Sequence, residues 1–135
     1  MKAVADKGGV VGVYFMPYLR ADMHPAAADV IAHVEHVAKV VGEDHVGIGT
    51  DNGVLPQATD AEATRKLNEW ALKRIDAGIA APGEGLNVWP MVSDYNSIDR
   101  YRRLASDLQK RGWSEARLEK LFGGNFLRVY RDAWG

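Results

Sequence analysis

Apolar residues recur at two spacings along the chain, and each spacing predicts one kind of element. Residues 9–15 are apolar or aromatic on both faces, which is typical of a buried parallel strand. Within residues 25–41, valines fall three or four positions apart, which predicts a helix with one buried face. Residues 45–50 form a second short apolar run, followed by turn-forming residues. This order of strand, helix and strand predicts a right-handed βαβ unit with two parallel strands.

The segments on either side of this unit are predicted to be mostly helical. Residues 1–7 have the character of the last turn of a helix, which Gly8 would end. The four residues from Thr59 to Glu62 predict a capping box, in which the Thr59 hydroxyl and the Glu62 carboxylate satisfy backbone donors. The helix that follows is expected to end near Gly78.

A long irregular stretch separates this helix from the C-terminal third of the chain. Residues 79–96 contain several Pro, Gly and Asn residues, so we expect an excursion over the scaffold, and excursions of this length are often functional. Ser97 and Ser114 are then expected to cap two helices, and the apolar face of the first is expected to bear Ile98, Tyr101, Leu104 and Leu108. The run Gly123-Gly124-Asn125 predicts a break before a last helix.

Composition and charge exclude several functional classes. With 135 residues, 47% hydrophobic and 26% charged, the chain has the composition of an ordinary globular protein, and residues 1–135 are expected to form a single unit. The formal net charge of −1 gives no support for binding nucleic acid or an anionic membrane. The absence of cysteine excludes disulfides, thiolate zinc sites and cysteine nucleophiles. No signal peptide or membrane segment is evident, so a cytoplasmic location is the default expectation, with a targeting signal upstream of Met1 left open.

Asp51 is the sharpest candidate for a functional residue. It directly follows the second apolar run, and ligands bind at the carboxyl ends of strands in parallel sheets and barrels. The alternative is that Asp51 only forms a turn with Asn52 and Gly53, as Asp residues often do by bonding their own backbone. Spacing alone leaves both interpretations open.

The four histidines are weaker candidates. His33 and His36 lie one helical turn apart and could chelate a metal, but surface histidines beside an apolar stripe are ordinary, and this second interpretation is favoured. His24 follows the first strand without an evident partner, and His45 opens the second strand, at the opposite end. The chain has neither a dinucleotide-binding glycine loop nor a nucleophilic serine motif.

Three stretches, at residues 9–15, 33–51 and 121–130, include the runs Gly-Ile-Gly-Thr-Asp and Gly-Gly-Asn-Phe-Leu-Arg-Val. In order and spacing they resemble the membrane dipeptidase family (renal dipeptidase, peptidase family M19). The resemblance covers nearly all of this chain but only the C-terminal third or so of a family member. It implies a (β/α)8 TIM barrel, a fold of about 250 residues. We therefore expect an α/β chain that is the C-terminal part of such a barrel, with two parallel strands and C-terminal helices.

The resemblance also implies an activity and a cofactor. Family members are metallodipeptidases, hydrolases that use two zinc ions to cleave the amide bond of a dipeptide, and a homodimer is implied as well. No position of this chain matches a family zinc ligand, and His33 and His36 match positions that are not ligands. The chain alone is therefore expected to bind no zinc and to be inactive, with the ligands upstream of Met1.

Two substrate-binding residues follow from the same resemblance. Asp51 corresponds to the family's Asp that faces the free amino group of the substrate, and Tyr18 corresponds roughly to an aromatic position of the pocket. The family often continues Asp-Phe-Asp-Gly, whereas this chain has Asp51-Asn52-Gly53 and so lacks one acid and one Phe. The alternative is a non-catalytic α/β binding or interaction module that retains only the fold.

Overall fold

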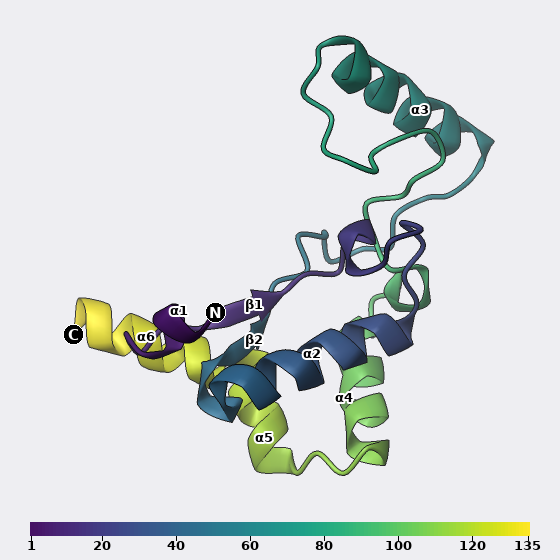
Figure 1. The fold of residues 1–135 in the computed structure, drawn as a ribbon. Helices are drawn as coiled ribbons and strands as arrows, with labels where there is room; N and C mark the ends of the chain where they lie inside the picture. Colours follow the sequence, from purple (N-terminus) through teal and green to yellow (C-terminus); the bar gives the residue numbers. More distant parts are fainter.

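The computed structural model describes residues 1–135, and its centre is a two-stranded parallel sheet (Figure 1). Strand β1 (Val11–Val13) pairs with β2 (Val46–Ile48), and helix α2 (Ala27–Val41) makes the crossover between them. The predicted βαβ unit is therefore confirmed. Both strands are shorter than the apolar runs that predicted them, because each has a single neighbour and only the paired residues form a ladder.

The hydrophobic core lies on one face of this sheet. Val13 and Phe15 point into it, whereas Gly12 and Tyr14 face the other side and are exposed, as alternation along a strand requires. Helices α2, α4 (Arg100–Lys110) and α5 (Glu115–Glu119) cover the buried face. Their most buried side chains are Val30, Val34, Leu104, Leu108 and Leu118.

Two of the predicted helix caps are corrected by the structure. Helix α3 (Ala61–Asp76) is capped by Asp60, whose carboxylate accepts a hydrogen bond from the Ala63 N–H at 2.8 Å, and not by Thr59. Its end at Asp76, two residues before Gly78 with its φ of 67°, agrees with the predicted end near Gly78. Ser97 does not cap α4, because that helix begins only at Arg100.

The remaining helices follow the prediction more closely. Short helix α1 (Lys2–Ala5) ends before Gly8, which has φ = 79°. Ser114 caps α5 by accepting a hydrogen bond from the Arg117 N–H at 3.4 Å. A π-helical turn over Lys120–Gly124 then leads into α6 (Asn125–Trp134), which confirms the predicted break. No helix of the structure is both long and apolar enough to cross a bilayer.

The excursion between β2 and α4 stands away from the sheet. Helix α3 and the irregular segment after it project from the body of the molecule and return to it before α4 (Figure 1). The chain regains the core at Val92 and at Tyr95, which lies in a 3-10 turn, Ser93–Tyr95. The predicted excursion at 79–96 is therefore the returning half of a larger one.

Candidate functional site

Asp51 lies where the chain leaves β2. Thr50 before it is buried, whereas Asp51 is exposed and has φ = 54°, in the left-handed region that residues other than Gly rarely adopt. Its carboxylate accepts no hydrogen bond from the chain. The bond typical of such a turn comes instead from Thr50, whose hydroxyl accepts from the Asn52 N–H at 3.4 Å. The Asp51 side chain is thus free to meet a ligand.

A set of polar contacts holds the residues that follow Asp51. The Asn52 side-chain amide donates to the carbonyl of Thr50 at 2.8 Å and to that of Phe15 at 3.4 Å, which joins the exits of the two strands. Gln57 donates to the Asn52 side-chain oxygen. Asn96 binds Gln57 twice, accepting from its N–H at 2.7 Å and donating to its carbonyl at 2.9 Å. The loop after β2 is therefore fixed from both sides.

Tyr18 lies in a 3-10 turn, Pro17–Leu19, shortly after β1. Its hydroxyl donates to Glu84 at 2.8 Å, and Glu84 also accepts from Arg74 at 2.8 Å. Partial burial, together with the bond to Glu84, raises the pKa of Tyr18, while the hydrogen bond from Arg74 lowers the pKa of Glu84. Tyr18 therefore links the exit of β1 to the excursion, and it shares no hydrogen-bond partner with Asp51.

Three of the four histidines, all but His36, have a ring nitrogen in contact with a backbone carbonyl. His33 Nε2 lies 2.9 Å from the carbonyl oxygen of Leu19, and His45 Nδ1 lies 2.8 Å from that of Gly9. His24 Nδ1 is 2.6 Å from the Asp22 carbonyl oxygen. No group of three or more His, Asp or Glu side chains that could hold a metal ion occurs in the structure.

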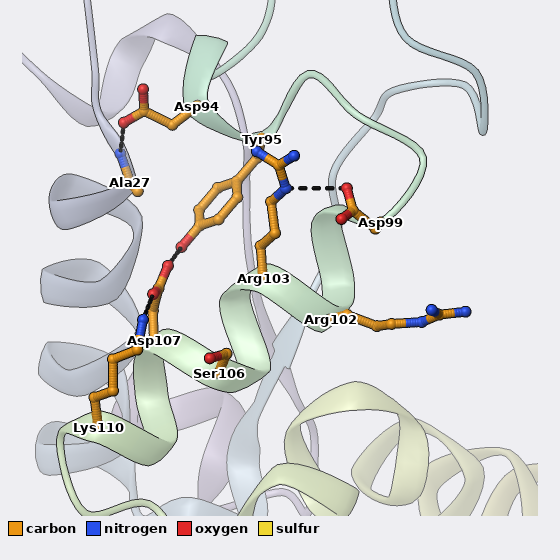
Figure 2. A pocket seen from close by; sticks show the side chains of 9 residues that line it. All are labelled: Ala27, Asp94, Tyr95, Asp99, Arg102, Arg103, Ser106, Asp107 and Lys110. Atoms are coloured by element: carbon orange, nitrogen blue, oxygen red, sulfur yellow. Dashed lines mark hydrogen bonds and ion pairs between the residues drawn. The ribbon is translucent and has the colours of Figure 1, made fainter.

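A shallow cleft beside α4, which sequence reasoning missed, is lined mostly by charged residues (Figure 2). Buried Tyr95 donates to Asp107 at 3.2 Å, and this burial raises the pKa of Tyr95. Lys110 binds the same carboxylate at 2.9 Å, and Arg103 pairs with Asp99 at 3.0 Å. Because the charges neutralise one another within the cleft, it has no marked preference for a charged ligand. Asp99 and Arg103 are four residues apart, and Asp107 and Lys110 are three apart. This spacing, which is typical of ion pairs along a helix, could have indicated the charged cleft from the sequence.

The buried face of α4 differs from the expected one and brings a further residue to the site. Ile98 and Tyr101 were expected to line the core, but they are 69% and 49% exposed. The buried positions are Arg100, Leu104 and Leu108, four residues apart. This spacing was visible in the sequence, yet an arginine in an apolar stripe is readily assigned to the surface.

A family model for membrane dipeptidase (peptidase family M19) matches residues 1–81 and 77–134. The chain belongs to the membrane dipeptidase family. This confirms the resemblance carried by the Gly-Ile-Gly-Thr-Asp and Gly-Gly-Asn-Phe-Leu-Arg-Val runs. The family assignment rests on nearly the whole length of the chain.

Individual relatives also match nearly the whole chain. Dipeptidase ataJ of Aspergillus terreus is 30% identical over 93% of this chain, which spans 23% of that protein. An uncharacterized protein in the pqqA 5′ region of Klebsiella pneumoniae is 27% identical over 99% of the chain and 39% of its own length. The chain thus spans well under half the length of the curated relatives it matches.

Solved structures confirm the fold. An amidohydrolase from Pseudomonas aeruginosa matches with a TM-score of 0.70 and 29% identity, over 99% of this chain and 39% of that one. A metallo peptidase of family M19, dipeptidase AC, matches with a TM-score of 0.66 at 19% identity, over 31% of its length. The two parallel strands and their helices are therefore part of a TIM-barrel fold, as expected for this dipeptidase family.

Proposed function

We propose that this chain forms the C-terminal part of a metal-dependent dipeptidase and supplies part of the wall of its substrate pocket. The observation that supports this most is the family match over nearly the whole chain. The names dipeptidase and metallo peptidase, which two of the matched proteins bear, agree with it. No observation favours the alternative of a non-catalytic module.

In this proposal, Asp51 binds the free ammonium group of the dipeptide. Its carboxylate is exposed at the carboxyl end of a barrel strand and is not used by the chain itself. A carboxylate and an ammonium form a charge-assisted hydrogen bond, which is stronger than a neutral one. Asn52 turns its amide toward Thr50 and Phe15, so this loop offers a single acid and accommodates a single ammonium.

Tyr18 forms a second part of the wall. Its ring is half exposed beside the exit of β1, and its hydroxyl is oriented by Glu84. The excursion thereby contributes to the pocket through Glu84 and Arg74, even though its helix projects from the body. The ring offers apolar contact to the substrate side chain.

The two zinc ions of the family do not fit the residues of this chain. No three His, Asp or Glu side chains converge, and three of the four histidines have a ring nitrogen bonded to a backbone carbonyl. We therefore assign the metal ligands to the rest of the barrel. The role of residues 1–135 is to bind and orient the substrate. The homodimer and the cytoplasmic location remain predictions.

Reconstitution tests this function. The chain is co-expressed with the part of the Pseudomonas aeruginosa amidohydrolase that it does not match, and the purified complex is supplied with zinc and assayed on dipeptides. We expect hydrolysis of dipeptides that have a free amino group and weaker hydrolysis of their N-acetylated forms. A stable, zinc-loaded complex that cleaves no dipeptide would contradict the proposal.

A further inference from the structure

Arg100 is a buried cation without an acidic partner. The residue is only 4% exposed, and no carboxylate pairs with its guanidinium. Its three hydrogen bonds all go to backbone carbonyls: Ser97 at 2.9 Å, Gly53 at 2.8 Å and Val54 at 3.5 Å. A buried charge is costly unless it is well hydrogen-bonded, so these carbonyls determine where the guanidinium lies.

The scaffold behind Arg100 is rigid. Leu104 and Leu108 follow it on the same face of α4, and both are fully buried in the core. The helix is therefore docked firmly, and Arg100 in its first turn projects from a fixed base. The planar fork of a guanidinium fixes the direction of each bond that it donates. Gly53 and Val54 are thus held at a set distance from the core.

These two carbonyls lie two and three residues after Asp51, whose backbone requires support. A left-handed φ of 54° is unfavourable for a residue with a side chain and persists only where the surroundings hold it. The Asp51 carboxylate makes no bond that would stabilise this conformation. The support comes from its neighbours: Asn52, which binds the exit of β1, and Gly53, which Arg100 holds.

We infer that Arg100 is a positioning residue for Asp51, and that Asn96 assists it through Gln57. Arg100 holds the chain two and three residues after Asp51, and Asn96 holds it at Gln57. Together they present the Asp51 carboxylate, free of bonds, at the carboxyl end of β2. The inference rests on the proposed function and deepens it, because a positioned, unbonded Asp51 carboxylate matters only if Asp51 binds the substrate.

The first experiment needs no substrate. Amide hydrogen exchange and residual dipolar couplings are measured by NMR on the 135-residue chain, for the wild type and for Arg100→Lys, which keeps the charge and loses the fork. We expect amide exchange at Asn52, whose N–H is hydrogen-bonded to Thr50, to be at least tenfold faster and Asp51 to leave its left-handed conformation, with protection in α2 unchanged. Arg102→Lys, on an exposed residue of the same helix, is the matched control. An unchanged loop, or an equal loss of protection throughout the chain, would overturn the inference.

A second variant covers the case in which Arg100→Lys does not fold. Asn96→Ala removes both contacts with Gln57 from a half-buried position and is expected to loosen the same loop. If neither variant changes the amide exchange of Asn52 or the backbone conformation of Asp51, the positioning role is wrong. If Arg100→Lys is unfolded, the exchange in Asn96→Ala decides the question alone.

The second experiment separates positioning from general stability in the reconstituted complex. Arg100→Lys is expected to raise KM for a dipeptide about tenfold while kcat changes less than twofold. In a background of Asp51→Asn, the same substitution is expected to add nothing, because the group it positions is already gone. An additional loss in the double variant would overturn the inference. A different outcome is that Arg100→Lys loosens the loop while Asp51→Asn has normal kinetics. That outcome would refute the proposed function of Asp51 but would support the contact between Arg100 and the loop.

Discussion

The side-chain amide of Asn125 donates a hydrogen bond to the backbone carbonyl of Val46 at 2.8 Å. The N–H of Gly49, directly after β2, donates to the Val13 carbonyl of β1. Backbone groups of successive residues in a strand point to alternate edges, so the Val46 carbonyl, three residues earlier, points away from β1. The same amide donates to the Glu43 carbonyl, also at 2.8 Å. The first residue of α6 thus satisfies carbonyls of Glu43 and Val46 on the side of β2 away from β1, and Asn125 is itself only 3% exposed.

Asn125→Ala should therefore destabilise the chain. It leaves the Val46 carbonyl without its donor in a buried position, which costs about 1–3 kcal/mol. Urea unfolding measures the change. The control is Asn68→Ala, which removes contacts with Asn87 on the exposed excursion and should cost less than about 0.5 kcal/mol. Equal losses in the two variants would refute the role given to Asn125.

Gly47, in the middle of β2, and Gly49, directly after β2, should respond in opposite ways to alanine. A Cβ at Gly47 would overlap the ring of Phe126, whereas a Cβ at Gly49 would meet nothing within 4 Å. Gly47→Ala is expected to cost about 1–3 kcal/mol through overpacking. Gly49→Ala should be neutral or stabilise by about 0.4–1 kcal/mol, since alanine restricts the unfolded chain. Thermal unfolding of both variants checks the difference in sign.

The ion pair between Glu35 and Arg111 should make stability depend on pH. Two hydrogen bonds of 2.7 Å join the groups, and the bond from Arg111 lowers the pKa of Glu35. A pKa that folding lowers stabilises the native state above the ordinary glutamate pKa, about 4.3, and this contribution is lost as the pH falls through the folded value. Both side chains are partly exposed, at 31% and 54%, so we expect about 1 kcal/mol or less.

The measurement compares Glu35→Gln with the wild type by urea unfolding at pH 7 and at pH 3. The wild type should be more stable at pH 7, and the difference should shrink at pH 3. Glu62→Gln, in a more exposed pair with Lys66, should show a smaller effect. A difference of the same size at both pH values would show that the pair does not act through the charge of Glu35.

Replacing Asp51 by Asn distinguishes ligand binding from turn formation. Asn keeps the shape and the tolerance of left-handed backbone but loses the charge. In the reconstituted complex, we expect kcat/KM for a dipeptide to fall at least tenfold, equivalent to about 1.4 kcal/mol, with a melting temperature lowered by no more than a few degrees. Asp6→Asn, on another exposed carboxylate, is the control. Unchanged kinetics would return Asp51 to the role of a turn former.

The buried face of α4 can be tested by two alanine variants. Leu104 is fully buried, and its replacement should cost about 2–5 kcal/mol, whereas Ile98 is 69% exposed and should cost less than about 0.5 kcal/mol. The sequence pattern had counted both as core residues. A large loss at Ile98 in urea unfolding would restore the original interpretation of the helix.

The sequence predicted those parts of the fold in which a local pattern is decisive. The βαβ unit follows from residues 9–50, because the valine stripe of α2 and the two apolar runs match the environments they occupy. The error at α4 has a physical cause: the helix begins at Arg100, not directly after Ser97, so Ile98 lies before it and cannot join its buried face. A polar side chain whose partners are distant carbonyls gives no local signal of burial.

For the candidate site, the sequence predicted the position of Asp51 but not the contacts that hold its loop. The position of Asp51 after a strand was visible, since strand ends can be located from the pattern. The contacts that hold its loop could not be predicted, because Arg100 lies 47 residues after Gly53 and 46 after Val54, and Asn96 lies 39 residues after Gln57. Only the folded chain brings α4 to the exit of β2.

The bond from Asn125 to Val46 also bears on the order in which the chain can fold during its synthesis. The βαβ unit is complete once residue 48 has been made, and its helix and strands are close in sequence, so the entropy of closing it is modest. The donor to the Val46 carbonyl, however, is the side chain of Asn125, which is made 79 residues later. Until α6 emerges from the ribosome, the carbonyls of Glu43 and Val46 lack the donor that the folded chain gives them. A pause in translation between these points would prolong that interval and delay the full stability of the βαβ unit.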